Sequence, residues 1–488
     1  MKTIPKYPYL ILVLLAFFLA YFKLVRFEAL AYFLDDFTNN LEGSYSWLIG
    51  RPLTFANGFG QLNTAHNYFL MPFLGPIALY FGAKGIFVFY ILCNFILWLY
   101  VFKLTQNHNF SFLITFIFLF FNPTFLWIFD HPDVGWSVEM LYFPFAIMYA
   151  ISLKLNLRYS IYVFAMLLMA VREEGIILVA MIHITFLILN LKNYKSIFYD
   201  KKLWLFGIAY TLLFGVSMVY LASKGNSNSF VESAFSILKL HFNDINFHLT
   251  NFAYLGQAIL LIFPFILFYI SFQKFNLPHF LFYLLFLFLL FALTFFQTIR
   301  YYDKFYFQIV SITWAIRFIL PFTFTIAFLA LNFNPKQVNF QLSKFKFGLI
   351  LILFLVQFLF ISFIRQDVSY KQLLSTLITH KPQHRMQELL QEVDIEYIKK
   401  IEKAMPARSS IYIGDYLVPI FTNHFIVWPD RYKEFEKADI AIIPRGEAHI
   451  HLKNELPLIM KNNYKIVQTF GAYEVYATPE YSKYLMIK

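Results

Sequence analysis

Polar residues that could do acid–base chemistry gather in residues 34–72, between the first and second long apolar runs of the chain. Two adjacent carboxylates, Asp35 and Asp36, follow the first run, and a loop rich in Asn and Gly leads from them to His66. A carboxylate at the water edge of a bilayer can take a proton from a bound hydroxyl, so Asp36 is the candidate base and Asp35 the alternate. The alternative stays open that both residues simply cap a helix or mark its end in water.

Three further charged groups lie beside apolar runs: Asp130-His131-Pro132-Asp133, Arg172-Glu173-Glu174-Gly175 and Arg300-Tyr301-Tyr302-Asp303-Lys304. Arg172, Arg300 and Lys304 are the cations placed to bind a phosphate, and the planar fork of Arg binds two oxygens at once. The alternative is that they pair with acids close in sequence. Arg172 would then pair with one of the two glutamates that follow it, and Arg300 with Asp303.

The two histidines of these polar segments are candidates for supporting roles. His131 is flanked by Asp130 and Asp133, and imidazole with carboxylate oxygens suits Mg²⁺ or Mn²⁺. Pro132 makes the same four residues a plausible tight turn whose side chains cap the next helix. A divalent cation therefore stays open, and His66 is a supporting residue without a separate role.

The composition places the chain among membrane proteins. Of its 488 residues, 59% are hydrophobic, 22% aromatic and only 14% charged, with 65 Phe and 33 Tyr. So much apolar surface indicates a polytopic membrane protein. The formal charge of +12 does not indicate nucleic-acid binding, because most Lys and Arg lie in short links between apolar runs. The single cysteine, Cys93, leaves no intramolecular disulfide.

Apolar runs predict about eleven membrane spans. They lie near residues 7–27, 85–103, 110–129, 135–153, 159–172, 175–191, 203–222, 254–273, 279–299, 306–331 and 347–364. Residues 67–82 are too short to span comfortably and contain two prolines, so we place them at the interface as a juxtamembrane or re-entrant element. Most lysines of the links then lie on the cytoplasmic side, as the positive-inside rule requires. This predicts a cytoplasmic N-terminus, an extracytoplasmic C-terminus, and all the charged groups above on the outer face.

Three motifs carry a resemblance to a known family. They are Asp36 with Gly50-Arg51-Pro52-Leu53, Ala65-His66 and Pro72; Phe121-Asn122-Pro123 with Asp130-His131-Pro132-Asp133; and Arg172-Glu173-Glu174-Gly175. From about Asp36 to the C-terminus, the chain resembles the bacterial membrane-protein family called domain of unknown function 2079. Glu42 stands where that family more often has Gln, Trp47 is shifted from its usual spacing, and Arg172 replaces the more usual Lys.

That family is grouped with the GT-C glycosyltransferases. Those enzymes are multi-span proteins with an acidic residue early in the first outer loop, juxtamembrane helices after it, and often a C-terminal outer domain. The resemblance implies a transferase in the bacterial inner membrane that moves a sugar from a polyprenyl-phosphate donor to a glycan, lipid or protein acceptor.

The residues themselves fit such a reaction. Sugar transfer from a lipid phosphate needs a base for the acceptor, cations for the leaving phosphate, and an apolar groove for the lipid tail. Asp36 would be the base, and displacement assisted by one base would invert the anomeric configuration. Two other classes remain: a transporter or lipid flippase, which usually has midplane charges and internal repeats, and a membrane scaffold without catalysis.

The composition changes near Arg365 to that of a soluble domain. Residues 386–405 have helical periodicity, and five short β-rich runs follow near 409–414, 425–429, 439–444, 465–470 and 474–478. We expect a GT-C-like membrane domain of residues 1–364 with an extracytoplasmic α/β domain of residues 365–488. The C-terminal domain contains no Gly-rich phosphate loop, so we assign no reaction to it.

Overall fold

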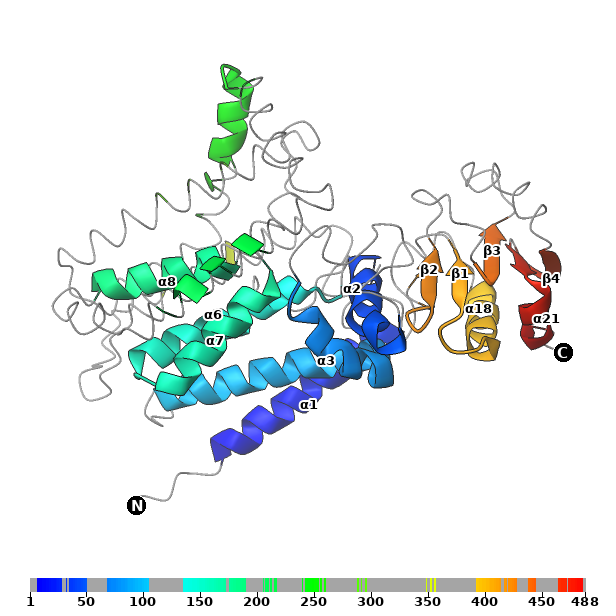
Figure 1. Ribbon diagram of the computed structural model, residues 1–488, viewed down its shortest axis with the longest axis horizontal. Helices are drawn as coiled ribbons and strands as arrows, with labels where there is room; N and C mark the ends of the chain where they lie inside the picture. Colours follow the sequence, from blue (N-terminus) through cyan, green and yellow to red (C-terminus); the bar gives the residue numbers. More distant parts are fainter. Residues whose placement is uncertain are drawn as a thin grey trace.

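The computed structural model describes only part of the chain. The described residues are 7–28, 32, 35–50, 68–104, 135–172, 175–189, 392–413, 417–427 except 419, 438–444, 464–485 except 472, and scattered residues between 205 and 356. They form a bundle of helices with a small mixed sheet beyond one of its ends (Figure 1).

The regular helices of the bundle lie within residues 7–189. Its elements are α1 (Tyr7–Glu28), α2 (Asp35–Tyr45), the 3₁₀ helix η1 (Ser46–Ile49), α3 (Met71–Leu104), the 3₁₀ helix η3 (Val138–Leu141), α6 (Tyr142–Lys154), α7 (Arg158–Val171) and α8 (Gly175–Leu189). Helices α1, α3, α6, α7 and α8 lie close to the positions of five predicted spans. The predicted spans at 110–129, 203–222, 254–273, 279–299, 306–331 and 347–364 lie wholly or mostly outside the described residues.

Contacts at both ends show that α1 and the second part of α3 run antiparallel. Near the start of α1, the ring of Tyr9 meets the ring of Phe102 edge to face, with centroids 5.3 Å apart. At the other end, Lys84 Nζ lies 2.6 Å from Glu28 Oε1. Both side chains of this ion pair are about half exposed, so the pair adds at most about 1 kcal/mol to stability.

Helices α7 and α8 form a tight hairpin, and the turn between them lies beside the start of α3. The Leu70 N–H donates to the Ala170 carbonyl over 2.7 Å, which fixes the start of α3 beside the end of α7. Gly175 opens α8, and a Cβ there would overlap the Leu168 carbonyl, so the close turn requires glycine. We call this end, with the last turn of α1, helix α2, the start of α3, η3 and the α7–α8 turn, the α2 end of the bundle.

Helix α3 contains a break at Gly82. Its backbone angles, φ 58° and ψ −150°, are non-helical, and they divide the 34 residues into residues 71–81 and 83–104. Eleven residues of helix extend roughly 16 Å, which is short of a hydrocarbon core of about 30 Å. The segment before the break buries Met71, Leu74 and Ala78 and exposes Phe73. The break therefore lies where the sequence analysis separates the interfacial element from the next span.

Of the helices in the described part of the chain, α1 and α3 are long and apolar enough to span a membrane. Several large apolar side chains of α1 remain exposed, among them Leu14, Phe17 and Phe18. Phe17 is 71% exposed.

The C-terminal unit comprises α18 (Glu392–Ala404), β1 (Ser410–Tyr412), β2 (Phe425–Val427), β3 (Ile440–Pro444), β4 (Lys465–Phe470), β5 (Tyr473–Ala477) and α21 (Pro479–Leu485). The strand order is β2-β1-β3-β5-β4. Strands β2, β1 and β3 are parallel, while β5 is antiparallel to both β3 and β4. The five strands and the helix before them lie where the sequence pattern predicts them, and β4 and β5 form the expected hairpin.

The C-terminal unit lies beyond the α2 end of the bundle (Figure 1). The guanidinium of Arg408 lies 5.9 Å from the ring centroid of Tyr45, on α2. Asn423, before β2, approaches the break in α3, since a Cβ on Gly82 would lie 2.8 Å from its Oδ1. The break in α3 thus also meets the C-terminal unit.

We expect Gly82→Ala to destabilise the protein by about 1–3 kcal/mol, because a Cβ strains the backbone at a positive φ. Gly207→Ala is the control: this residue is helical, and a Cβ there meets nothing within 4 Å. That change should be neutral or stabilising by up to about 1 kcal/mol. Denaturant unfolding in detergent measures both. Equal stability of Gly82→Ala and the wild type would show that the break is not needed.

Candidate functional site

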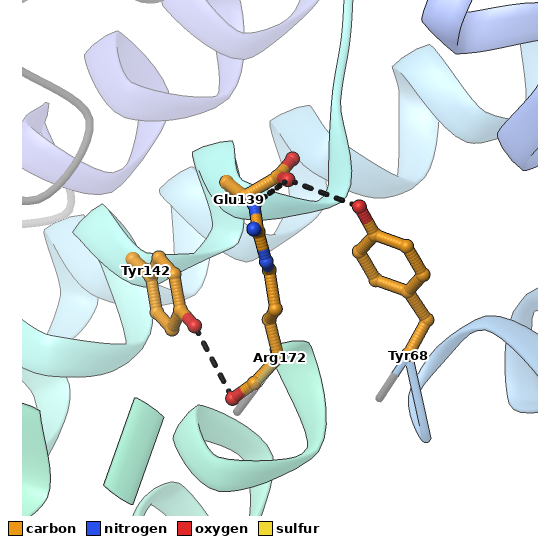
Figure 2. A network of polar contacts seen from close by, with 4 residues as sticks. All are labelled: Tyr68, Glu139, Tyr142 and Arg172. Atoms are coloured by element: carbon orange, nitrogen blue, oxygen red, sulfur yellow. Dashed lines mark hydrogen bonds and ion pairs between the residues drawn. The ribbon is translucent and has the colours of Figure 1, made fainter. Parts of the chain in front are cut away.

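A buried ion pair lies at the α2 end of the bundle (Figure 2). Arg172 Nη1 lies 3.1 Å from Glu139 Oε1, and both side chains are 4% exposed. The Tyr68 hydroxyl donates to the same Glu139 oxygen over 3.4 Å. The Tyr142 hydroxyl donates to the main-chain carbonyl of Arg172 over 3.3 Å. Four residues from three separate segments of the sequence therefore converge on one polar network.

The local fold explains why these residues meet. Helix α7 ends at Val171, and Arg172 is extended, with φ −168° and ψ 168°, so its side chain leaves the helical path. Glu139 lies in η3, just before α6 packs against α7. Tyr68 lies two residues before Leu70, whose N–H donates to the Ala170 carbonyl at the end of α7. Each partner thus comes from a point where the chain enters or leaves a helix.

Burial makes this network costly to break. An ionised side chain in apolar surroundings costs several kcal/mol unless it is paired and hydrogen-bonded. Glu139 accepts hydrogen bonds from both Arg172 and Tyr68, and these stabilise its ionised form. The carboxylate in turn fixes the direction of the guanidinium. The arrangement holds an oriented cation at the α2 end.

Two more cations are buried nearby, on one face of α1. Lys23 Nζ donates to the Gly135 carbonyl over 2.6 Å, and it lies 5.1 Å and 5.2 Å from the ring centroids of Tyr32 and Phe87. The Arg26 guanidinium, one turn later, lies 5.3 Å from the same Tyr32 ring. Cation–π contacts of this kind contribute about 0.5–2 kcal/mol each.

The aromatic rings around Lys23 connect α1 to the start of α2. Phe37 stacks on Phe87 with centroids 5.2 Å apart, and it meets Trp136 edge to face at 5.9 Å. Phe37 directly follows Asp36 in the sequence. The backbone that carries the candidate base is therefore anchored through Phe37 against Phe87, a ring that also contacts the buried Lys23.

The structure places three of the predicted site residues at the α2 end. Asp35 and Asp36 are the first two residues of α2, and Arg172 belongs to the ion pair. Arg172 contacts Glu139, an acid that was not predicted as its partner, while the predicted pairing with Glu173 or Glu174 falls on residues outside the described part of the chain. The other predicted residues lie outside the described part of the chain: His66, Asp130, His131, Asp133, Glu173, Glu174, Arg300 and Lys304.

Four residues of the α2 end were not predicted from the sequence as site residues: Glu139, Tyr68, Lys23 and Arg26. Charged residues inside an apolar run are a signal for three of them: Lys23 and Arg26 in the first run, and Glu139 in the run at 135–153. Tyr68 has no comparable signal, because tyrosine is abundant throughout the chain.

Among the described residues, no three His, Cys, Asp or Glu side chains come together as a metal site. The predicted candidates Asp130, His131 and Asp133 are not among those residues. Use of Mg²⁺ or Mn²⁺ therefore stays a prediction.

The chain matches no known protein family, no curated protein and no solved structure. The resemblance to domain of unknown function 2079 and to the GT-C enzymes therefore stays a prediction.

We expect Arg172→Met and Glu139→Gln each to destabilise the protein by about 3–5 kcal/mol, because each removes the opposite charge that offsets a buried charge. The double variant should lose less than the sum of the two, with a coupling of roughly 1–3 kcal/mol. Unfolding of the four proteins of the cycle in detergent measures this coupling.

The exposed pair Glu28–Lys84 gives a matched control for that cycle. Its coupling should stay below about 1 kcal/mol, because solvent screens the pair. If the losses at Arg172 and Glu139 were additive, the buried pair would not act as a unit.

Proposed function

We propose that the protein is a membrane-embedded glycosyltransferase. It would move a sugar from a polyprenyl-phosphate donor to an extracytoplasmic glycan, lipid or protein acceptor, with inversion. The observation that carries this proposal is the gathering of the start of α2, which carries Asp35 and Asp36, and the buried Arg172–Glu139 pair at one end of the helical bundle. A carboxylate and an oriented cation at a bundle end are what a base and a phosphate site require.

The apolar outer surface of the bundle supports a membrane location. The exposed Leu14, Phe17 and Phe18 of α1, with Leu92 of α3, would cost free energy in water and none in lipid. The exposed aromatic residues Phe73 and Tyr80, before the break in α3, suit the membrane–water interface. We place the chain in the bacterial inner membrane, with its N-terminus in the cytoplasm and both the α2 end and the C-terminal unit outside.

In this proposal Asp36 takes the proton of the acceptor hydroxyl, with Asp35 as the alternate. General-base assistance of this kind contributes about 10²–10⁴ in rate. Because Glu139 offsets its charge, Arg172 would orient the donor phosphate more than neutralise it. We assign the larger share of the neutralisation to Arg300 and Lys304, and supporting roles to the remaining predicted residues. A divalent cation would assist at Asp130, His131 and Asp133 if one binds.

A transporter or lipid flippase is the second candidate. The buried Lys23 and Arg26 favour it, because charges inside membrane helices often mark substrate pathways. A transporter does not require Asp36 as a base, so substitution of Asp36 separates the two functions.

We expect Asp36→Asn to abolish most transfer while the protein still folds and inserts, because the amide cannot accept the hydroxyl proton. The measurement compares lipid-linked sugars and surface glycans in cells carrying the wild type, the variant or no copy of the gene. A polyprenyl-phosphate sugar should accumulate, and one sugar should disappear from a surface glycan, in both the variant and the deletion. Wild-type glycans in the variant would remove Asp36 as the base, and unchanged pools in both strains would contradict the transferase.

The topology has its own test. A reporter fused after Lys488 should be active only outside the cytoplasm, because the positive-inside rule with an interfacial 67–82 segment places the C-terminus there. A fusion after Lys154, at the opposite end of α6 from η3, should report the cytoplasm. A cytoplasmic signal from Lys488 would contradict both the topology and the shared outer face.

A further inference from the structure

A cleft of about 460 Å³ lies between the α2 end of the bundle and the C-terminal unit. Leu41 and Tyr45 of α2, with residues 78–82 of α3, line one wall. The end of α18, the turn that follows it and residues 422–424 line the other. The volume is within the range of about 300–1,000 Å³ that is usual for small-molecule sites.

Among the described lining residues of the cleft, Lys403 and Arg408 carry positive charge and Glu402 carries negative charge. Both cations are exposed. Neither forms an ion pair within the part of the chain that the structure describes; Arg408 instead lies over the ring of Tyr45. Glu402 is the acid among the described lining residues, and its Oε1 lies 3.7 Å from His424 Nε2. Within the described residues, two cations thus face the cleft with neither of them in an ion pair.

The backbone around the cleft is also unusual. Arg408 adopts φ 66°, a left-handed conformation that non-glycine residues take only at a cost and that often marks a functional site. The break at Gly82, with φ 58°, forms part of the opposite wall. The strained turn places Arg408 at the cleft, where its guanidinium reaches Tyr45 across the interface.

A buried histidine next to these cations completes the polar wall. His424 is 2% exposed, and its Nδ1 has no hydrogen-bond partner among the described residues. A buried polar atom without a partner is costly in a native structure. The geometry points to an oxyanion site: we propose that the cleft binds the phosphate or carboxylate group of a small ligand, with Arg408 and Lys403 as its cations.

This site is separate from the proposed reaction centre. Tyr45 is at the end of α2, roughly 13 Å along the helix axis from Asp36. Binding in the cleft does not require sugar transfer, so the proposal holds for a transferase and for a transporter alike.

The test is calorimetry on the purified full-length chain in detergent. Sodium phosphate and sodium glucuronate are titrated separately, each against sodium chloride at equal ionic strength. Saturable binding of phosphate alone assigns a phosphate ligand, and saturable binding of glucuronate alone assigns a carboxylate. No saturable binding of either anion would overturn the proposal.

Substitutions of the cleft residues test whether the anion binds in the cleft. Arg408→Gly removes the cation and also relieves the positive φ, so the protein should remain folded, with an affinity weaker by about tenfold or more. Lys403→Ala should weaken binding several-fold. Lys400→Ala is the matched control, since Lys400 lies on the same helix, has its ammonium 5.3 Å from the Tyr397 ring, and does not line the cleft. Wild-type affinity in Arg408→Gly, or an equal loss in Lys400→Ala, would place the anion elsewhere.

Discussion

The burial of charge constrains the structure of the α2 end. Arg172, Glu139, Lys23 and Arg26 are all nearly inaccessible to solvent, and each would cost several kcal/mol in apolar surroundings without compensation. The compensation comes from other segments of the chain: a carboxylate in η3 for Arg172, and a carbonyl before η3 with aromatic rings for Lys23. Helices α1, α3 and α7 must therefore meet the segment 135–141 in one arrangement.

This requirement explains why the ends of the helices, more than their middles, define the site. Apolar faces specify their register through the fit of interdigitating side chains, and cores with the same total volume tolerate extensive repacking. A buried ion pair cannot slide, since a shift of a few ångströms leaves both charges uncompensated. The Arg172–Glu139 pair and the Lys23–Gly135 hydrogen bond fix the register at the end where α2 begins. Helix α2, which carries Asp36, begins at this end of the bundle.

The sequence predicted the elements better than their contacts. Apolar runs and β-rich runs located helices α1, α3, α6, α7 and α8 and all five strands, because hydrophobic periodicity is a local property. The Arg172–Glu139 pair could not be found in this way. The two residues are 33 positions apart in the sequence, and the packing of α6 on α7 brings them together. Likewise, only the three-dimensional structure shows that Gly82 and Arg408 face the same cleft.

Helix α2 connects the two regions to which we assign function. Its first residues include the candidate base, while Leu41 and Tyr45 further along face the cleft against the C-terminal unit. The helix is short and polar on average, and residues near both of its ends make aromatic contacts. Phe37 packs against Phe87 and Trp136, and the ring of Tyr45 contacts the guanidinium of Arg408. A ligand that draws Arg408 away from Tyr45 would change the contact at the C-terminal end of α2.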